Sequence, residues 1–175
     1  MSNLNNFLAG KGYGLKEVLT ASGTWNWSDA GKPKKIFVRM IGGAGGNAEN
    51  GIGSSGGNGG NSVWDTVPQV ATTTATGGNG ATTSGIATAL SGMPNSGNVV
   101  GNQGSFCDLE ILNSHYGCPN HPKAGIITGW QGGFGELKEF EYEPTGNVSF
   151  TIGAGGTEGN TNNGDGNQGA IELYY

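Results

Sequence analysis

Residues 35–46 read KIFVRMIGGAGG, and the change of composition after Ile41 decides the fold. Before that point, β-branched and aromatic side chains predict a strand over residues 35–41. After it, the chain continues in glycine and alanine alone. A glycine block that directly follows a well-patterned strand argues against simple disorder, so we expect the glycines to belong to the folded domain.

Glycine supplies 37 of the 175 residues. The glycines are concentrated in blocks at residues 42–46, 56–60, 77–80 and 153–156. Glycine loses more conformational entropy on folding than any other residue, so this usage implies strained backbone or backbones packed with no side chain between them. Gly42 and Gly45 show the three-residue repeat of a polyproline II helix. The blocks are either flexible loops or packed polyglycine II helices, and the second interpretation is favoured.

Two neighbouring segments near the C-terminus have a period of two. In residues 138–143 and 147–152, apolar side chains alternate with polar ones, and the residues from Pro144 to Gly146 predict a turn. We expect a hairpin with one buried and one exposed face. Other expected elements are strands at residues 16–27 (bent at Gly23), 61–68 and 170–175, extended loops at 70–97 and a short helix at 2–9.

These patterns predict an all-β fold, a small antiparallel sandwich with glycine-rich loops or a polyglycine II layer. Residues 1–15 are interpreted as an N-terminal docking segment, with a local lid on the core as the alternative. Residues 16–175 form the glycine-rich β domain. Residues 81–132 break its rhythm, and we expect this insertion to carry what is specific to the protein, because long connections are usually functional or disordered.

The composition favours an ordered but small core. Apolar residues make up 34% of the chain and charged residues 12%, with a net charge of −5. Disordered chains combine high net charge with few aromatic residues, whereas this chain has four Trp, five Tyr and six Phe. With so few apolar residues we expect a homo-oligomer or a subunit of a larger assembly. The eight Lys and Arg residues form no basic stripe, which argues against nucleic-acid binding.

A cluster of metal-ligating residue types lies in the insertion. Both cysteines and both histidines of the chain belong to it, as Cys107, His115, Cys118 and His121. These four side chains could hold zinc, although their spacing matches no common zinc module. Ordinary loop residues, or a disulfide between Cys107 and Cys118, are the alternatives. Zinc is the one cofactor that the sequence suggests, and otherwise we expect none.

The sequence contains no arrangement typical of a catalytic site. The glycine blocks lack the Gly-Lys-Ser or Gly-Lys-Thr of a P-loop and the strand–glycine–helix context of a dinucleotide site. Glu136, Glu139, Glu141 and Glu143 recur too regularly along a strand to suggest a catalytic pair in a cleft. We therefore expect a protein that is not an enzyme.

Several segments, in order along the chain, resemble the glycine-rich domains of bacteriophage tail fibres and related virion proteins. The matching segments are residues 19–25 (LTASGTW), 35–43 (KIFVRMIGG), 60–64 (GNSVW), 150–156 (FTIGAGG) and 169–174 (GAIELY). The first two are similar to the strands that open those domains and lead into polyglycine. The resemblance covers about residues 18–80 and 133–175 and leaves out the insertion.

The resemblance implies a structural virion component, a tail-fibre or adhesin-like protein that contacts the host surface. Its partners would be other virion proteins and a bacterial receptor, either a carbohydrate or an outer-membrane protein. Aromatic side chains bury area at little entropic cost. Those in or beside the insertion are therefore candidates for the contact surface, with a place in the core as the alternative: Phe106, Tyr116, Trp130 and Phe134.

Without an apolar span or a secretory signal, the chain is expected in the virion, made in the host cytoplasm and released by lysis. A capsid decoration or head-fibre protein without a receptor role is the alternative within the same class. An ice-binding or surface-binding protein is the alternative from another class, although the threonines of residues 71–84 lack the regular spacing of a flat array.

Overall fold

The computed structural model describes residues 10–49, 55–65, 72–81, 98–99, 117, 129–130, 132–159 and 165–175. Within these residues the chain forms eleven strands. They are β1 (Leu15–Leu19), β2 (Gly23–Trp25), β3 (Ile36–Ile41), β4 (Ala48–Glu49), β5 (Ser62–Asp65), β6 (Thr73–Ala75), β7 (Asn98–Val99), β8 (Gly129–Trp130), β9 (Leu137–Tyr142), β10 (Val148–Thr151) and β11 (Ala170–Tyr174). The helix predicted at residues 2–9 lies outside the described residues.

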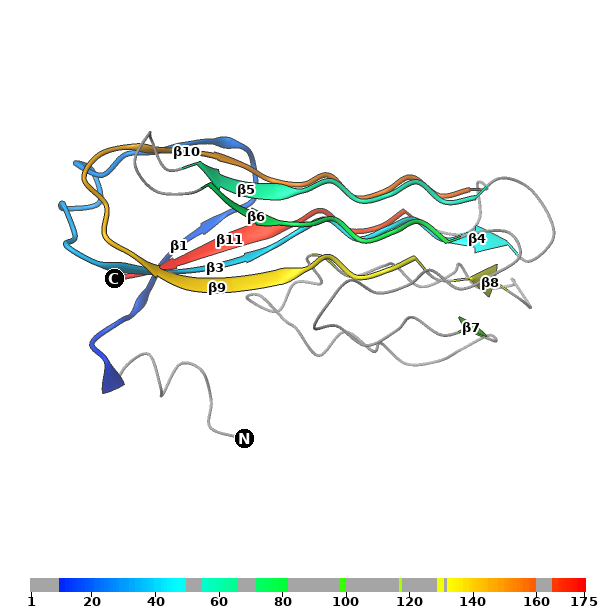
Figure 1. Ribbon diagram of the computed structural model, residues 1–175, viewed down its shortest axis with the longest axis horizontal. Coiled ribbons are helices and arrows are strands. Elements are labelled where there is room, and N and C mark those ends of the chain that lie inside the picture. Colours follow the sequence, from blue (N-terminus) through cyan, green and yellow to red (C-terminus); the bar gives the residue numbers. More distant parts are fainter. Residues whose placement is uncertain are drawn as a thin grey trace.

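Two four-stranded antiparallel sheets form a sandwich, which confirms the predicted fold class (Figure 1). The first sheet has the strand order β1-β11-β3-β9, and the second has the order β2-β10-β5-β6. A smaller sheet of the short strands β4, β8 and β7 lies at the far end of the molecule from the sandwich (Figure 1). The glycine-rich segments run between the sandwich and that end.

The core fills the space between the two four-stranded sheets. Alternate residues of β3 point inward, so that Ile36, Val38 and Met40 are fully buried. Trp64 of β5 is also fully buried, and its ring stacks on that of Phe150 with centroids 6.2 Å apart. Such aromatic pairs add about 0.5–1.5 kcal/mol beyond the apolar area that they bury. The core is thus built from a few large rings and β-branched side chains, as the small apolar fraction requires.

Residues 16–27 form two strands, not the single bent strand that the sequence predicts. β1 pairs with β11 at the edge of the first sheet, and β2 pairs with β10 at the edge of the second. The chain crosses from one sheet to the other through residues 20–22. The positions of the apolar residues within 16–27 do not reveal such a crossing, because the inward faces of the two sheets carry the same kinds of side chain.

The predicted hairpin of residues 138–152 is wrong in its pairing, although both strands exist. β9 pairs with β3 in the first sheet, whereas β10 pairs with β2 and β5 in the second. Phe140 of β9 and Phe150 of β10 therefore pack into one core from opposite sheets. A strand in either position needs one apolar and one polar face, so alternation predicts the strands without predicting their partners.

Six glycine-rich segments extend from the sandwich strands and run side by side (Figure 1). We call them together the glycine bundle, and they are residues 42–47, 55–61, 76–81, 132–136, 153–159 and 165–169. Backbone hydrogen bonds of 2.7–3.1 Å join them to one another. The bundle continues the sandwich without a break, because each segment is directly joined to one of its strands.

Segment 42–47 is the axis of the glycine bundle, since it forms hydrogen bonds with each of the other five segments. Gly42 and Gly45 both donate to segment 132–136. Gly43 and Gly46, each one residue further along the chain, both donate to segment 55–61. The partner of each N–H group therefore repeats every three residues, which is the period of the polyproline II helix. The polyglycine II conformation itself, and a layer built from it, stay predictions.

Gly117 supplies a further neighbour in the ring around this axis. Its N–H group donates to the carbonyl of Gln168, and its own carbonyl accepts from Gly135, at 2.8 and 2.9 Å. It thereby joins the segments 132–136 and 165–169, which are not otherwise bonded to each other among the described contacts. Gly117 belongs to the insertion of residues 81–132, so the bundle holds at least one point of the insertion in place.

Candidate functional site

The end of the glycine bundle furthest from the sandwich is the first candidate site. The short strand β4 follows segment 42–47 there, and segment 153–159 also ends there (Figure 1). Segments 76–81 and 132–136 flank the insertion at the same end. Loops carried at this end would therefore start and finish on backbone fixed by the bundle, which is how binding loops are commonly positioned on a rigid scaffold.

Asparagine side chains complete the hydrogen bonding of the bundle where no backbone carbonyl does. Asn58 Oδ1 accepts from the Gly80 N–H at 2.8 Å, and Asn61 Oδ1 accepts from the Gly77 N–H at 3.0 Å. Asn47 does the same for a glycine of another segment, Gly132, at 3.0 Å. None of these three asparagines is among the candidate residues predicted from the sequence. A spacing of three, such as that between Asn58 and Asn61, would place both side chains on one side of the predicted threefold helix.

Glu136 ties the bundle to the sandwich. Its Oε2 atom accepts from both the backbone N–H and the side-chain hydroxyl of Thr76, at 3.1 and 2.8 Å, and its Oε1 atom lies 2.7 Å from the Lys138 ammonium. Burial opposes ionisation of the carboxyl, but these bonds from Lys138 and Thr76 outweigh it and lower the pKa. The residue has a structural role at the base of two glycine segments.

Most of the residues proposed from the sequence as contacts or zinc ligands lie outside the described residues. Phe106 and Tyr116 lie there, as do the four candidate zinc ligands Cys107, His115, Cys118 and His121. Trp130 is part of β8, which pairs with β4 and β7. Phe134 is only 4% exposed, so its ring offers little area to a partner. In the part of the chain that the structure describes, no three His, Cys, Asp or Glu residues are grouped to hold a metal ion.

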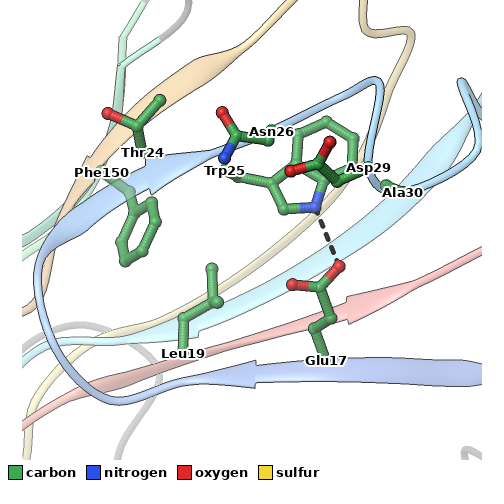
Figure 2. A pocket seen from close by; sticks show the side chains of 8 residues that line it. All are labelled: Glu17, Leu19, Thr24, Trp25, Asn26, Asp29, Ala30 and Phe150. Carbon is green, nitrogen blue, oxygen red and sulfur yellow. Dashed lines mark hydrogen bonds between the residues drawn. The ribbon is translucent and has the colours of Figure 1, made fainter.

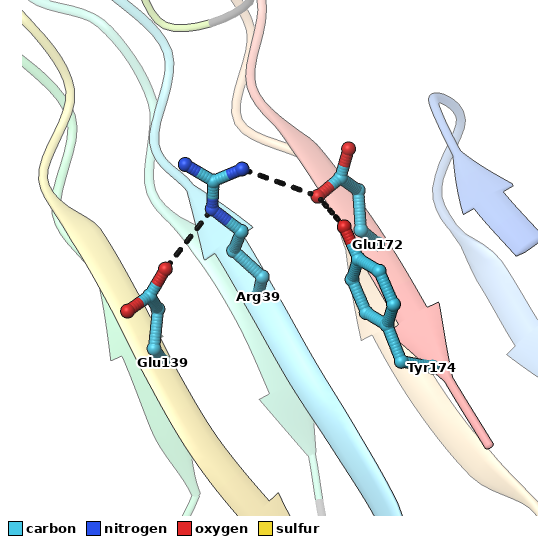
Figure 3. Close-up of polar contacts among 4 residues, drawn as sticks. All are labelled: Arg39, Glu139, Glu172 and Tyr174. Atoms are coloured by element: carbon cyan, nitrogen blue, oxygen red, sulfur yellow. Dashed lines mark hydrogen bonds and ion pairs between the residues drawn. The ribbon is translucent and has the colours of Figure 1, made fainter. Parts of the chain in front are cut away.

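Two carboxylates flank one guanidinium on the outer face of the first sheet (Figure 3). Arg39 of β3 lies directly between Glu139 of β9 and Glu172 of β11, with N–O distances of 3.0 and 3.5 Å. The Tyr174 hydroxyl donates to Glu172 at 2.7 Å, and burial together with this carboxylate raises the pKa of the tyrosine. Cross-strand ion pairs of this kind stabilise the pairing of strands, so this arrangement contributes to the stability of the first sheet.

An open pocket of about 230 Å³ lies where the edge strands of the two sheets separate (Figure 2). It is lined by residues of β1, β2 and β10 and of the turn after β2: Glu17, Leu19, Thr24, Trp25, Asn26, Asp29, Ala30 and Phe150. Trp25 and Phe150 are only 3% and 7% exposed and belong to the core. The pocket therefore has an apolar floor and a rim of polar side chains.

Two donors hold the Glu17 carboxylate at this pocket. The Trp25 indole N–H donates to Oε1 at 3.1 Å, and the Tyr175 hydroxyl donates to the same oxygen at 2.6 Å. Burial and the negative charge of Glu17 raise the pKa of Tyr175 to about 12, so its hydroxyl keeps the proton that it donates at neutral pH. The carboxylate is thus fixed in orientation by two neutral hydrogen-bond donors.

Comparison with models of known families, with curated proteins and with solved structures gives no match. Among the described residues, no helix has the length and apolar character needed to cross a membrane.

Proposed function

We propose that this chain is a structural component of a bacteriophage particle, a tail-fibre or adhesin-like protein that contacts the host surface. The sequence resemblance to glycine-rich domains of virion proteins motivates the proposal. The structural observation that supports it is the central position of segment 42–47, which bonds to every other segment of the glycine bundle. An adhesin needs its binding loops to be held by a rigid scaffold. A bundle whose segments are joined by backbone hydrogen bonds is such a scaffold.

In this proposal the sandwich and the far end of the glycine bundle contact different partners. The far end of the bundle, where the insertion leaves segment 76–81 and returns to segment 132–136, faces the host receptor. The sandwich faces the particle and its other proteins. The receptor class remains a carbohydrate or an outer-membrane protein, and the chain acts as a homo-oligomer or as a bound subunit, since its apolar fraction of 34% is small.

The experiment combines location with function. Labelled antibodies against the chain, imaged on intact particles by cryo-electron microscopy, are expected to mark the tail. A variant in which a short Gly-Ser linker replaces residues 105–116, so that Gly117 keeps its bonds to the bundle, is expected to assemble into particles but to lose adsorption to host cells. Glu143→Gln, an exposed change near the sandwich, serves as the matched control and is expected to leave adsorption unchanged.

Other outcomes overturn the proposal. Label on the head, together with loss of assembly in the linker variant, identifies a capsid decoration or head-fibre protein. Label on the tail with full adsorption by the linker variant removes the receptor role from the insertion. Absence of the chain from particles contradicts the virion assignment altogether.

A further inference from the structure

Asparagine followed by glycine is a chemically labile pair, because the glycine nitrogen can attack the asparagine side chain with no Cβ atom in its way. The chain has four such pairs, and the structure describes two of them, Asn58-Gly59 and Asn79-Gly80. Both lie in the glycine bundle. They are therefore two points at which the backbone of the bundle can be altered without an enzyme.

The reaction at such a pair requires rotation of the peptide group between the two residues. At Asn79, the Gly80 nitrogen loses its proton and bonds to the Cγ atom of the side chain, and ammonia leaves. Water then opens the cyclic imide to aspartate or isoaspartate. The nitrogen reaches Cγ only when the peptide group turns toward the side chain, so a peptide group that is held on both sides does not react.

The peptide group between Asn79 and Gly80 is held on both sides. Its carbonyl oxygen accepts from the Gly133 N–H at 2.7 Å, and its N–H donates to Asn58 Oδ1 at 2.8 Å. The same carbonyl oxygen packs so closely on Gly45 of the bundle axis that a Cβ atom there would overlap it. Rotation of this peptide group therefore requires that two hydrogen bonds break and that its contact with the axis is lost.

The two pairs differ in what holds the attacking nitrogen. The Gly59 N–H donates to a backbone carbonyl, that of Gly78, at 2.8 Å. The Gly80 N–H depends on a side chain, and its bond to Asn58 is exposed to water. A bond to one exposed side chain opens more easily than a bond between two backbone segments, since only the side chain has to rotate. The nitrogen of Asn79-Gly80 is therefore the less firmly held of the two.

We propose that Asn79-Gly80 is a latent deamidation site, which the folded bundle keeps unreactive and which the Asn58 side chain protects. Isoaspartate at this position adds a methylene group to the main chain of its segment. The next bond along that segment runs from the Ala81 N–H to the Gly46 carbonyl at 3.0 Å, and the added group shifts it out of register. Deamidation thus weakens the bundle next to the start of the insertion. This site is independent of the proposed function.

The first test compares the folded protein with the same protein unfolded in guanidinium chloride, both kept at mildly alkaline pH in ¹⁸O-labelled water. Peptide mapping by mass spectrometry follows the conversion, because each converted asparagine takes up labelled oxygen. Conversion of Asn79 is expected to be at least about tenfold slower in the folded protein. Within the folded protein Asn79 is expected to convert before Asn58. Equal rates in the two states, or the reverse order, would overturn the proposal.

Two variants separate local protection from overall stability. Asn58→Ala removes the acceptor of the Gly80 N–H, so it is expected to speed up conversion of Asn79 in the folded protein by about three- to fivefold, as suits one exposed hydrogen bond. Asn61→Ala is the matched control. It removes the acceptor of the Gly77 N–H, which follows no asparagine, and is expected to leave the rate at Asn79 unchanged.

A third variant restores the protection. Asn58→Asp keeps the acceptor oxygen, so it is expected to keep Asn79 as slow as in the parent protein. A rate in Asn61→Ala equal to or above that in Asn58→Ala would show that overall stability controls the reaction, and would overturn the role of Asn58. An unchanged rate in Asn58→Ala would overturn it as well. The comparison of folded and unfolded parent protein needs no variant, so a variant that fails to fold leaves the first test intact.

Discussion

Gly43 and Ala154 are in direct backbone contact, so that a Cβ atom added to Gly43 would overlap the carbonyl oxygen of Ala154. The two residues belong to different segments of the glycine bundle and are more than a hundred positions apart in the sequence. Gly45 and Gly46 meet carbonyl oxygens of other segments in the same way. The six segments therefore use glycine for close approach of backbones, whereas the left-handed conformations of the described chain lie outside these segments, at Gly12, Gly31, Lys32 and Gly117.

Gly43→Ala is expected to destabilise the protein by about 3 kcal/mol or more, because the obstacle is backbone that cannot move without breaking the bundle. Gly57→Ala is expected to cost about 1 kcal/mol, since its nearest obstacle is the Thr157 hydroxyl at 2.8 Å, with backbone at 3.2 Å. Gly146→Ala has open space around it and serves as the control. Urea unfolding gives the free energy of unfolding of each of the three variants. Equal values for the three would show that the bundle contacts do not form.

Asn61→Ala is expected to cost about 1–2 kcal/mol and Asn58→Ala less than about 1 kcal/mol. Both changes remove the acceptor of a glycine N–H, but the bond from Gly77 to Asn61 is partly buried, whereas the one from Gly80 to Asn58 is exposed to water. Asn61→Asp keeps the acceptor oxygen and is expected to retain most of the stability. Thermal unfolding distinguishes these cases, and a larger loss for Asn58→Ala would contradict the assignment.

Acid is expected to weaken the junction of sandwich and bundle through Glu136. Its pKa is lowered in the folded protein, so its contribution to stability is present above the ordinary value of 4.5 and is lost as the pH falls through the lower folded value. Glu136→Gln should reduce stability at neutral pH and flatten its decline below pH 4.5. The measurement is the midpoint of urea unfolding against pH. Parallel curves for the variant and the parent would exclude this role.

Tyr175 is expected to titrate late, since its pKa is raised to about 12 by burial and by the Glu17 carboxylate. Glu17→Gln removes the negative charge and should lower the pKa of this tyrosine while keeping its hydrogen bond. Absorbance of tyrosinate during alkaline titration, with Tyr175→Phe used to identify the residue, measures the change. An unchanged pKa in the Glu17 variant would place the two side chains apart in solution.

The sequence predicted the strands well and their partners poorly. The pattern of residues 35–41 and 170–175 predicts β3 and β11, and they pair at the centre of the first sheet. The alternation at 138–152 predicts β9 and β10 but not their separation into two sheets. The alternation of apolar and polar residues shows which side of a strand is buried. The choice of partner strand depends on other strands of the sheets, and the local pattern carries no information on them.

The candidate sites were less accessible to sequence reasoning. Asn58 and Asn61 look like loop residues until the neighbouring segment is present to donate to them. The pocket combines Glu17 with Asp29 through two edge strands that the sequence merges into one. In both cases the feature depends on how segments of different sheets or bundle positions are brought together, which the local pattern of residues does not reveal.

Segment 42–47 is the axis of a bundle joined by backbone hydrogen bonds, and the proposed rigid support for the loops depends on it. Hydrogen exchange of its amides tests this most directly, because the N–H groups from Gly42 to Gly46 all donate to other segments. These amides are expected to exchange as slowly as the amides of β3, near the limit set by global unfolding. Exchange at the rate of unstructured glycine peptides, with β3 still protected, would contradict it.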